Sequence, residues 1–412
     1  MAASPADGAQ LESVPKTVEL TFSEAVDPHG VLVTAGGTRL KAGVPAGRPS
    51  HVVAAVSAGG VKPSHGRLTL AWRVVDEEDG HASSGSVGYR IDAAASAGAA
   101  SPAAPSAARS PAAVKDALTT VRWVGYLSLA LFVGGLAFVA ALWPQGTSDR
   151  RTRVVLVLSW AAGLLATVAQ AGLQGAYARL GTLGDAFTSA AYSEVLGSEV
   201  GIVLAARALL WVLAAIVLAA ALQGGRRAAR SPGWRVGAAA VGFGLLRATG
   251  MSGHNSEGTH PVWGEVADLV HLAGVSLWIG GLVLLVVGVL PRRNADELAV
   301  VVPRYSILAL TSVTSIAGAG SVLAWQVVGS VHGLLHTSYG HKLMVKVAVL
   351  AVVLSVAQRS RTWVRHRLDL AVLLRGDAAT VRPLIRSVAV EACLVLAVLA
   401  AASVLVMADP GR

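Results

Sequence analysis

The sequence predicts a multidomain protein, with a small all-β domain followed by an all-α polytopic membrane bundle of about eight transmembrane helices. Three observations predict this order. Short apolar and polar runs alternate over residues 11–92, residues 93–113 are almost uncharged Ala, Ser, Gly and Pro, and long Ala, Val, Leu and Gly runs follow Val114. We therefore expect a β domain at 1–92, a linker at 93–113 and a membrane domain at 114–412.

The overall composition supports a membrane protein. Of the 412 residues 54% are hydrophobic and only 14% are charged, and the mean hydropathy is +0.59, which is too apolar for an ordinary soluble enzyme. The net charge of +10 comes mostly from arginines in short loops between apolar runs, a pattern typical of cytoplasmic membrane loops. We therefore exclude nucleic acid as a partner and expect a lipid bilayer instead. The single cysteine, Cys393, rules out a disulfide framework.

The first domain has the period-two pattern of half-buried strands. Alternating runs occur at 17–22, 30–33, 68–72 and 89–91, with breaks at Pro28, Gly36, Pro49 and Gly85. Such short runs separated by turn residues predict a small antiparallel sandwich or barrel. The Ala, Ser and Pro of the linker cannot build a core and predict a flexible tether.

Eight apolar stretches are long enough to be considered as membrane spans, since a helix needs about 20 residues to cross the hydrocarbon. They lie at about 117–143, 154–176, 200–222, 236–251, 262–290, 305–328, 343–358 and 387–408. With the first domain outside, the inner loops hold 17 Lys and Arg residues and the outer loops and tail hold 3. This asymmetry predicts a bacterial plasma membrane protein with both its N-terminal domain and its C-terminus extracytoplasmic.

Paired glycines recur in the first and fifth predicted spans, at Gly134-Gly135 and Gly280-Gly281, within similar apolar surroundings. Both spans run from outside to inside in the predicted topology. The echo has two explanations, a duplicated four-helix unit or close packing of helices through small residues.

Histidine and methionine gather on the predicted outer side. Ten of the 11 histidines face or approach the outside, and Met251, Met344 and Met407 each lie at the outer end of a span. Imidazole suits Cu(II) and thioether suits Cu(I), so this combination points to copper, in either oxidation state in the membrane domain. Methionines that only fill gaps and loop histidines that are merely polar are the alternative explanation.

His271 is the sharpest single candidate because it lies inside the fifth span, ten residues and therefore about 15 Å beyond Pro261. An ionisable residue at that depth is costly and indicates function. Asp268, three residues earlier on the same helical face, is expected to orient the imidazole, and a purely structural histidine is the alternative. Glu265 and Asp268 are expected to support the site, and Arg207, Arg247 and Lys346 to snorkel or pair with them.

Three further groups of metal-ligand types surround this span. Met251, His254 and His260 border one outer loop, and His332, His336 and His341 form a second group with spacings of four and five. In the first domain, Asp79-Gly80-His81 places a carboxylate and an imidazole two residues apart. Each pattern alone is weak.

The residues resemble two known families that together cover nearly the whole chain. The runs Ser4–Ala9, Val18–Glu24, Trp72–Val75, Asp79–His81 and Ser84–Ser86 look like the CopC copper-binding family. The membrane part resembles CopD, through Ser252–His254, Asp268–His271 with Leu277–Gly281, Tyr339–Leu343 with Lys346, and Glu391 with Ala408–Pro410.

The CopC resemblance implies a β-sandwich that binds Cu(II) through an N-terminal histidine and an Asp-x-His pair, here Asp79 and His81. The N-terminal histidine has no counterpart in this sequence, and residues 76–78 contain one extra residue. His29, His51 and His65 are all candidates for a further ligand.

These features lead us to expect copper import without enzymatic activity. The β domain would capture Cu(II), an extracytoplasmic copper chaperone is a candidate partner, and the His and Met groups of the membrane domain would accept the ion. Two alternatives stay open at this stage: copper sequestration outside the cell, and a haem-bearing cupric reductase, which needs a second buried histidine facing His271. No nucleotide-binding loop is present, which argues against an ATP-driven pump.

Overall fold

A computed structural model describes residues 1–36, 38–56, 66–77, 82–91, 112–178, 181–251, 261–292 and 294–328, with short pieces between 335 and 348. The chain forms two compact units. The first comprises Met1–Leu118 with Ala169–Val203, and the second comprises Thr119–Val168 with Leu204–Arg412. The predicted order, a β domain followed by a helical bundle, is confirmed.

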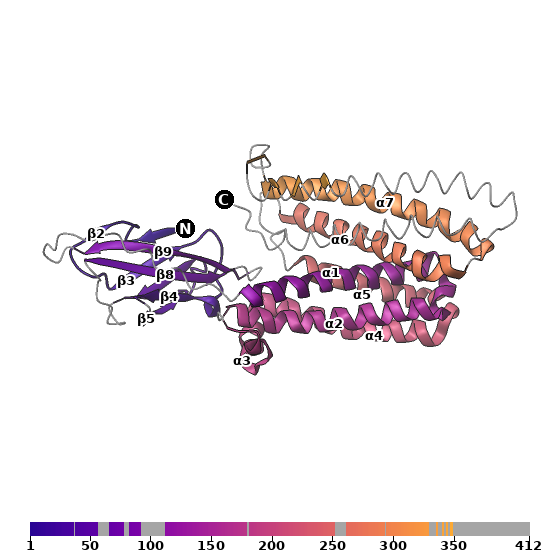
Figure 1. The fold of residues 1–412 in the computed structure, drawn as a ribbon, viewed down its shortest axis with the longest axis horizontal. Helices are drawn as coiled ribbons and strands as arrows, with labels where there is room; N and C mark the ends of the chain where they lie inside the picture. Colours follow the sequence, from indigo (N-terminus) through magenta and orange to yellow (C-terminus); the bar gives the residue numbers. More distant parts are fainter. Residues whose placement is uncertain are drawn as a thin grey trace. The chain divides into compact units, whose positions relative to one another are not determined.

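Two sheets make up the β domain (Figure 1). Their strand orders are β1-β3-β7-β6 and β2-β9-β8-β4-β5, and β2 and β9 are the one parallel pair among the described strands. The strands are β1 (Ala2–Ser4), β2 (Gln10–Leu11), β3 (Thr17–Thr21), β4 (Leu32–Ala35), β5 (Thr38–Arg39), β6 (Lys41–Gly43), β7 (His51–Ala55), β8 (Arg67–Val75) and β9 (Ala82–Ile91).

The alternating pattern of each strand places one face in a shared core. Val18 and Leu20 of β3 point inward, as do Leu70 and Trp72 of β8 on the other sheet, and all four belong to one apolar cluster. Successive side chains of a strand point to opposite faces, so the period-two runs identified these core residues correctly. Of the two predicted alternatives, the structure is a sandwich.

The helices that follow are long and apolar. They are α1 (Ala112–Ala141), α2 (Arg150–Ala178), α3 (Ser189–Leu196), α4 (Glu199–Arg230), α5 (Pro232–Gly250), α6 (Pro261–Leu284) and α7 (Ala295–Val328). In the described part of the chain, five helical stretches are long and apolar enough to cross a membrane: 113–141, 150–178, 199–230, 262–292 and 296–326. These match five of the eight predicted spans. The fourth corresponds to the shorter α5, and 343–358 and 387–408 lie mostly or wholly outside the described residues, so the number eight stays a prediction.

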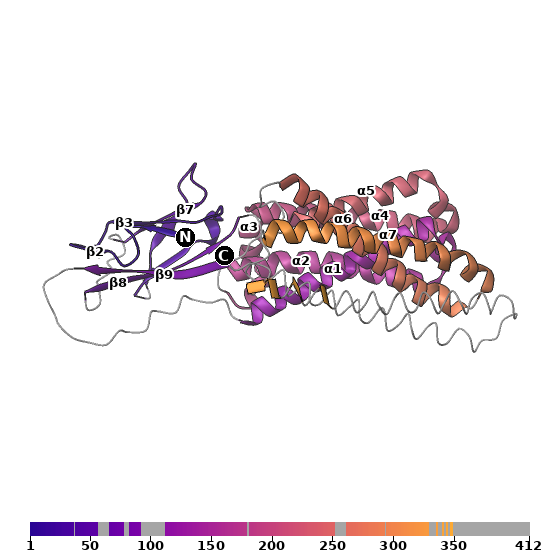
Figure 2. The same cartoon turned by 90° about the horizontal axis from the view of Figure 1, so that it is seen from above.

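Close backbone contact joins α1 to α6. A Cβ atom at Gly134 would lie 1.8 Å from the Ser276 carbonyl oxygen, and one at Gly280 would lie 2.5 Å from that of Ala130. The paired glycines noted in the sequence therefore pack against each other, as the close-packing explanation predicts, and the duplicated four-helix unit stays a prediction. Figure 2 shows α7 beside α6, and Tyr305 joins these two helices by donating a 2.7 Å hydrogen bond to the Trp278 carbonyl.

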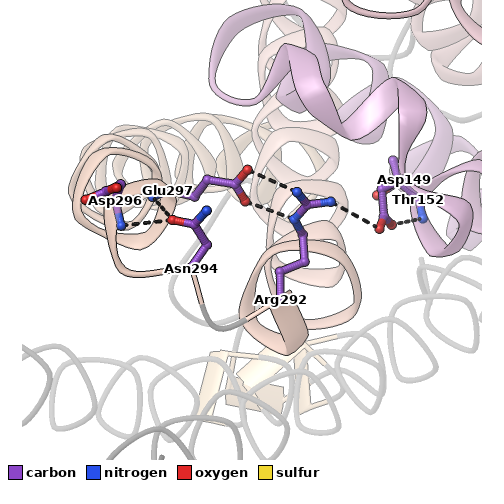
Figure 3. A network of polar contacts seen from close by, with 6 residues as sticks. All are labelled: Asp149, Thr152, Arg292, Asn294, Asp296 and Glu297. Carbon is purple, nitrogen blue, oxygen red and sulfur yellow. Dashed lines mark hydrogen bonds and ion pairs between the residues drawn. The ribbon is translucent and has the colours of Figure 1, made fainter. Parts of the chain in front are cut away.

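A polar network holds the turn between α6 and α7 (Figure 3). A π-helix at Leu285–Val289 and a 3₁₀ turn at Leu290–Arg292 end α6. The Arg292 guanidinium donates to both carboxylate oxygens of Glu297, at 3.0 and 3.2 Å, and lies 3.8 Å from Asp149. Asn294 caps α7 by accepting from the backbone N–H groups of residues 296 and 297. Arg292 thus ties the turn to the beginning of both α2 and α7.

Candidate metal site

His271 belongs to α6 and is the one histidine in helices α1 to α7. Its ring contacts α7. Its Nδ1 atom lies 3.3 Å from the Ile316 carbonyl oxygen of α7. A Cβ atom at Gly320 would lie 3.5 Å from the same nitrogen, so the absence of a side chain there leaves room beside the ring. When Nδ1 carries the proton and donates it to the carbonyl, the lone pair that a metal requires resides on Nε2.

Two carboxylates accompany His271 on α6. Glu265 accepts a 2.6 Å hydrogen bond from the Arg247 guanidinium of α5, and both side chains are about one-third exposed. Pairing, one of the two roles expected for Arg247, is therefore what the structure shows. A Cβ atom at Gly250 would lie 2.2 Å from Asp268 Oδ2, so this glycine allows the Asp268 carboxylate to approach α5.

Tyr126 of α1 links the Asp268 carboxylate electrostatically to a buried arginine of α4. Tyr126 of α1 interacts electrostatically with Asp268, and also with Arg207 of α4, which is only 8% exposed. The helical unit therefore holds an ionisable group from each of α1, α4 and α6, of which Arg207 is buried and Tyr126 and Asp268 are partly exposed.

The remaining predicted membrane ligands are placed only in part. Met251 caps the end of α5 and is 50% exposed, and His336 and His341 are exposed. His254, His260 and His332 lie outside the described residues. No three His, Cys, Asp or Glu side chains come together as a metal site in the part of the chain that the structure describes. The ligand set around His271, including the orienting role of Asp268, stays a prediction.

The Asp79 and His81 pair of the β domain also lies outside the described residues. Among the three candidate extra ligands, His51 begins β7, and its Nδ1 atom lies 2.8 Å from Glu19 Oε1 and 3.3 Å from Thr21 Oγ1. Arg48 donates to the same Glu19 oxygen at 2.6 Å, so an ion pair already engages this carboxylate. His29 lies in a 3₁₀ turn at Pro28–Gly30, and His65 is not described.

Sequence reasoning missed the α7 side of the site. Ile316 contributes a backbone carbonyl, which no side-chain pattern reveals, and Gly320 contributes space. The only signal for them in the sequence is the small-residue run Ala317–Gly320 in the sixth predicted span, a composition that permits close helix packing.

Comparison with known proteins gives matches to three family models along the chain. Residues 1–92 match the CopC domain, residues 113–259 match the N-terminal domain of copper resistance protein D-like proteins, and residues 299–405 match copper resistance protein D. The copper transport protein CutJ of Bacillus subtilis (strain 168) is 30% identical over 363 residues, which cover 83% of this chain. The chain spans 63% of the length of that relative.

A solved structure matches as well. The crystal structure of CopC from Methylosinus trichosporium OB3b is 23% identical, and the match covers 22% of this chain and 90% of that chain with a TM-score of 0.19.

Proposed function

We propose that the chain is a member of the copper resistance family and imports copper across the bacterial plasma membrane. The matches to a CopC domain and to two copper resistance D-type models along one chain support this proposal. The N-terminal domain and the C-terminus lie outside the cell in this proposal. The name of the CutJ relative, a copper transport protein, supports transport as the activity.

The observation that supports the proposal most strongly is the environment of His271. An imidazole inside a predicted span is costly unless it has a partner or a function. Here its Nδ1 atom faces the Ile316 carbonyl, the arrangement that metal-bound histidines use to fix their tautomer. The neighbouring Asp268 carboxylate adds negative charge on the same helix, which favours a cation over an anion, whereas the charge of Glu265 is balanced by Arg247.

Copper in this proposal is the transported ion, and three groups of metal ligands in the protein bind it one after another. Asp79 and His81 of the β domain bind Cu(II) outside, with or without a chaperone that delivers it. Met251, His254 and His260, with the His332, His336 and His341 group, accept the ion at the outer surface. His271 then binds it within the helical unit, where Asp268 stabilises its charge.

The test is copper uptake by cells that produce the full chain with His271→Ala. We expect uptake to fall about 10-fold or more. Removing a residue that only hydrogen-bonds to a metal ligand already weakens metal binding by about 10 to 100-fold, and His271→Ala removes the ligand itself. Tyr305→Phe is the matched control, because it removes a hydrogen bond between the same two helices without removing a copper donor. It should leave uptake close to the wild-type rate at equal membrane levels.

Unchanged uptake and unchanged copper binding in His271→Ala would contradict the proposal. An absorbance spectrum of the purified protein addresses the haem alternative, since a Soret band would favour a reductase instead. That alternative needs a second buried imidazole facing His271, and helices α1 to α7 contain no other histidine.

A further inference from the structure

Arg73 is buried on a face of β8 that its strand pattern assigns to solvent. Trp72 and Val74 point into the sandwich core, so Arg73 between them points out of it. Yet Arg73 is only 4% exposed. A charged side chain almost never becomes this buried unless a specific partner covers and binds it.

The covering group is the end of α2, which belongs to the same compact unit as the β domain. The Arg73 guanidinium donates to the Tyr177 carbonyl at 2.7 Å and to the Ala178 carbonyl at 3.1 Å. Its central carbon also lies 4.9 Å from the centre of the Tyr177 ring. Burial lowers the pKa of Arg73, and the nearby Tyr177 opposes that shift.

The chemistry of this contact suits a helix end. The last carbonyls of a helix lack partners within the helix and carry the negative end of its dipole, so they are natural acceptors for a guanidinium. Arg73 satisfies two such carbonyls and stacks on an aromatic ring at once, a combination that needs the planar fork of arginine.

The α2 end is itself held firmly. A Cβ atom at Gly172 would lie 2.1 Å from the Ala186 carbonyl oxygen, and one at Gly175 would lie 2.4 Å from that of Ala191. The carboxyl end of α2 therefore packs backbone to backbone on the segment around α3. Tyr177 and Ala178 consequently form a platform fixed by close packing and not a loose helix end.

We propose that Arg73 and the carboxyl end of α2 form a docking site that holds the copper-capturing domain at this end of α2, so that the domain can deliver copper to the membrane domain. The docking itself does not depend on copper. The delivery role rests on the proposed import function.

The test uses the full chain in lipid nanodiscs and compares wild type, Arg73→Met, Arg73→Lys and Arg90→Met. Arg90 is an exposed arginine on the neighbouring strand β9 and serves as the matched control. Amide hydrogen exchange is followed in residues 70–76 and 174–178, and copper uptake is measured in cells for the same variants.

We expect Arg73→Met to raise exchange in both segments about 10-fold or more, because two charge-assisted hydrogen bonds are lost. Arg73→Lys, which keeps the charge but loses the fork, should show a smaller rise, and Arg90→Met should match wild type. Copper uptake should fall most in Arg73→Met, less in Arg73→Lys and not in Arg90→Met. Unchanged protection of the amides in β3 and β7 verifies that the sandwich remains folded. If Arg73→Met loses this protection because the sandwich unfolds, the docking site is judged from Arg73→Lys instead.

Wild-type protection of both segments in the Arg73 variants would overturn the docking site. Increased exchange with undiminished uptake would overturn the delivery role. If wild-type cells take up no copper by this protein, the import function fails, while the exchange data still judge the docking site.

Discussion

The close contact between α1 and α6 predicts how much stability the chain loses when alanine replaces Gly280. Gly280→Ala places a Cβ atom 2.5 Å from the Ala130 carbonyl oxygen and 2.7 Å from both Gly134 Cα and Gly135 N. Ordinary contact begins at 3.4 Å, so α1 has to move by 3.4 − 2.5 = 0.9 Å. All three atoms belong to the backbone, and no side-chain rotation relieves the clash.

Overpacking of this kind costs about 1–3 kcal/mol, and the better helix propensity of alanine returns about 0.8–1 kcal/mol. Because only backbone atoms clash, the cost lies at the upper end of the overpacking range, and we expect a net loss of about 2 kcal/mol. Each kcal/mol lowers the melting temperature by about 2–4 °C for a unit of this size.

The assay is thermal unfolding of the purified full chain in detergent micelles. Gly318→Ala on α7 is the matched control, because a Cβ atom there meets nothing within 4 Å. The control should be neutral or slightly stabilising, by up to about 1 kcal/mol. Equal melting temperatures for wild type and Gly280→Ala would refute the assigned contact between α1 and α6.

Three further predictions concern other parts of the chain. Arg292→Gln leaves the Glu297 carboxylate, whose side chain is only 12% exposed, without its bidentate partner, and should cost about 2 kcal/mol of stability in the same thermal assay. Asn294→Ala removes the cap of α7 and should cost about 1 kcal/mol, whereas Asn294→Asp should cost little. In the β domain, burial and then the Asp7 charge raise the pKa of Tyr89 to about 12 from its usual 10.0, so the stability that this group contributes is fully present below pH 10 and is lost as the pH rises towards 12. In urea titrations, Tyr89→Phe should therefore lose less stability between pH 10 and pH 12 than wild type. At neutral pH it should cost about 1 kcal/mol of stability, because the hydrogen bond to the Pro5 carbonyl is lost. An unchanged loss of stability at alkaline pH would contradict the assignment.

Much of the fold could be predicted because local patterns determine it. The alternating run around β3 reveals which residues face the core, and apolar length alone reveals the five helical stretches that qualify as spans. His271 could also be selected from the sequence, since an imidazole in an apolar run is conspicuous. The family resemblance identified from residue motifs is confirmed by the matching family models.

The rest depends on contacts between segments far apart in the chain. The Ile316 carbonyl that faces His271 comes from a helix 45 residues later, and backbone atoms leave no trace in a sequence pattern. The burial of Arg73 could not be predicted either, because the period-two rule describes the sandwich alone and not what covers it. The Arg292 network likewise joins residues 149 and 297, whose pairing no local rule predicts.

Cytosolic copper in a deletion strain tests the central claim most directly, because import and sequestration predict opposite signs. Cells that lack the protein are compared with the same cells complemented by wild type or by His271→Ala, at fixed external copper. Import predicts that cytosolic copper falls in the deletion strain, that wild type restores it, and that His271→Ala does not. A rise of cytosolic copper in the deletion strain would contradict import and favour sequestration outside the cell.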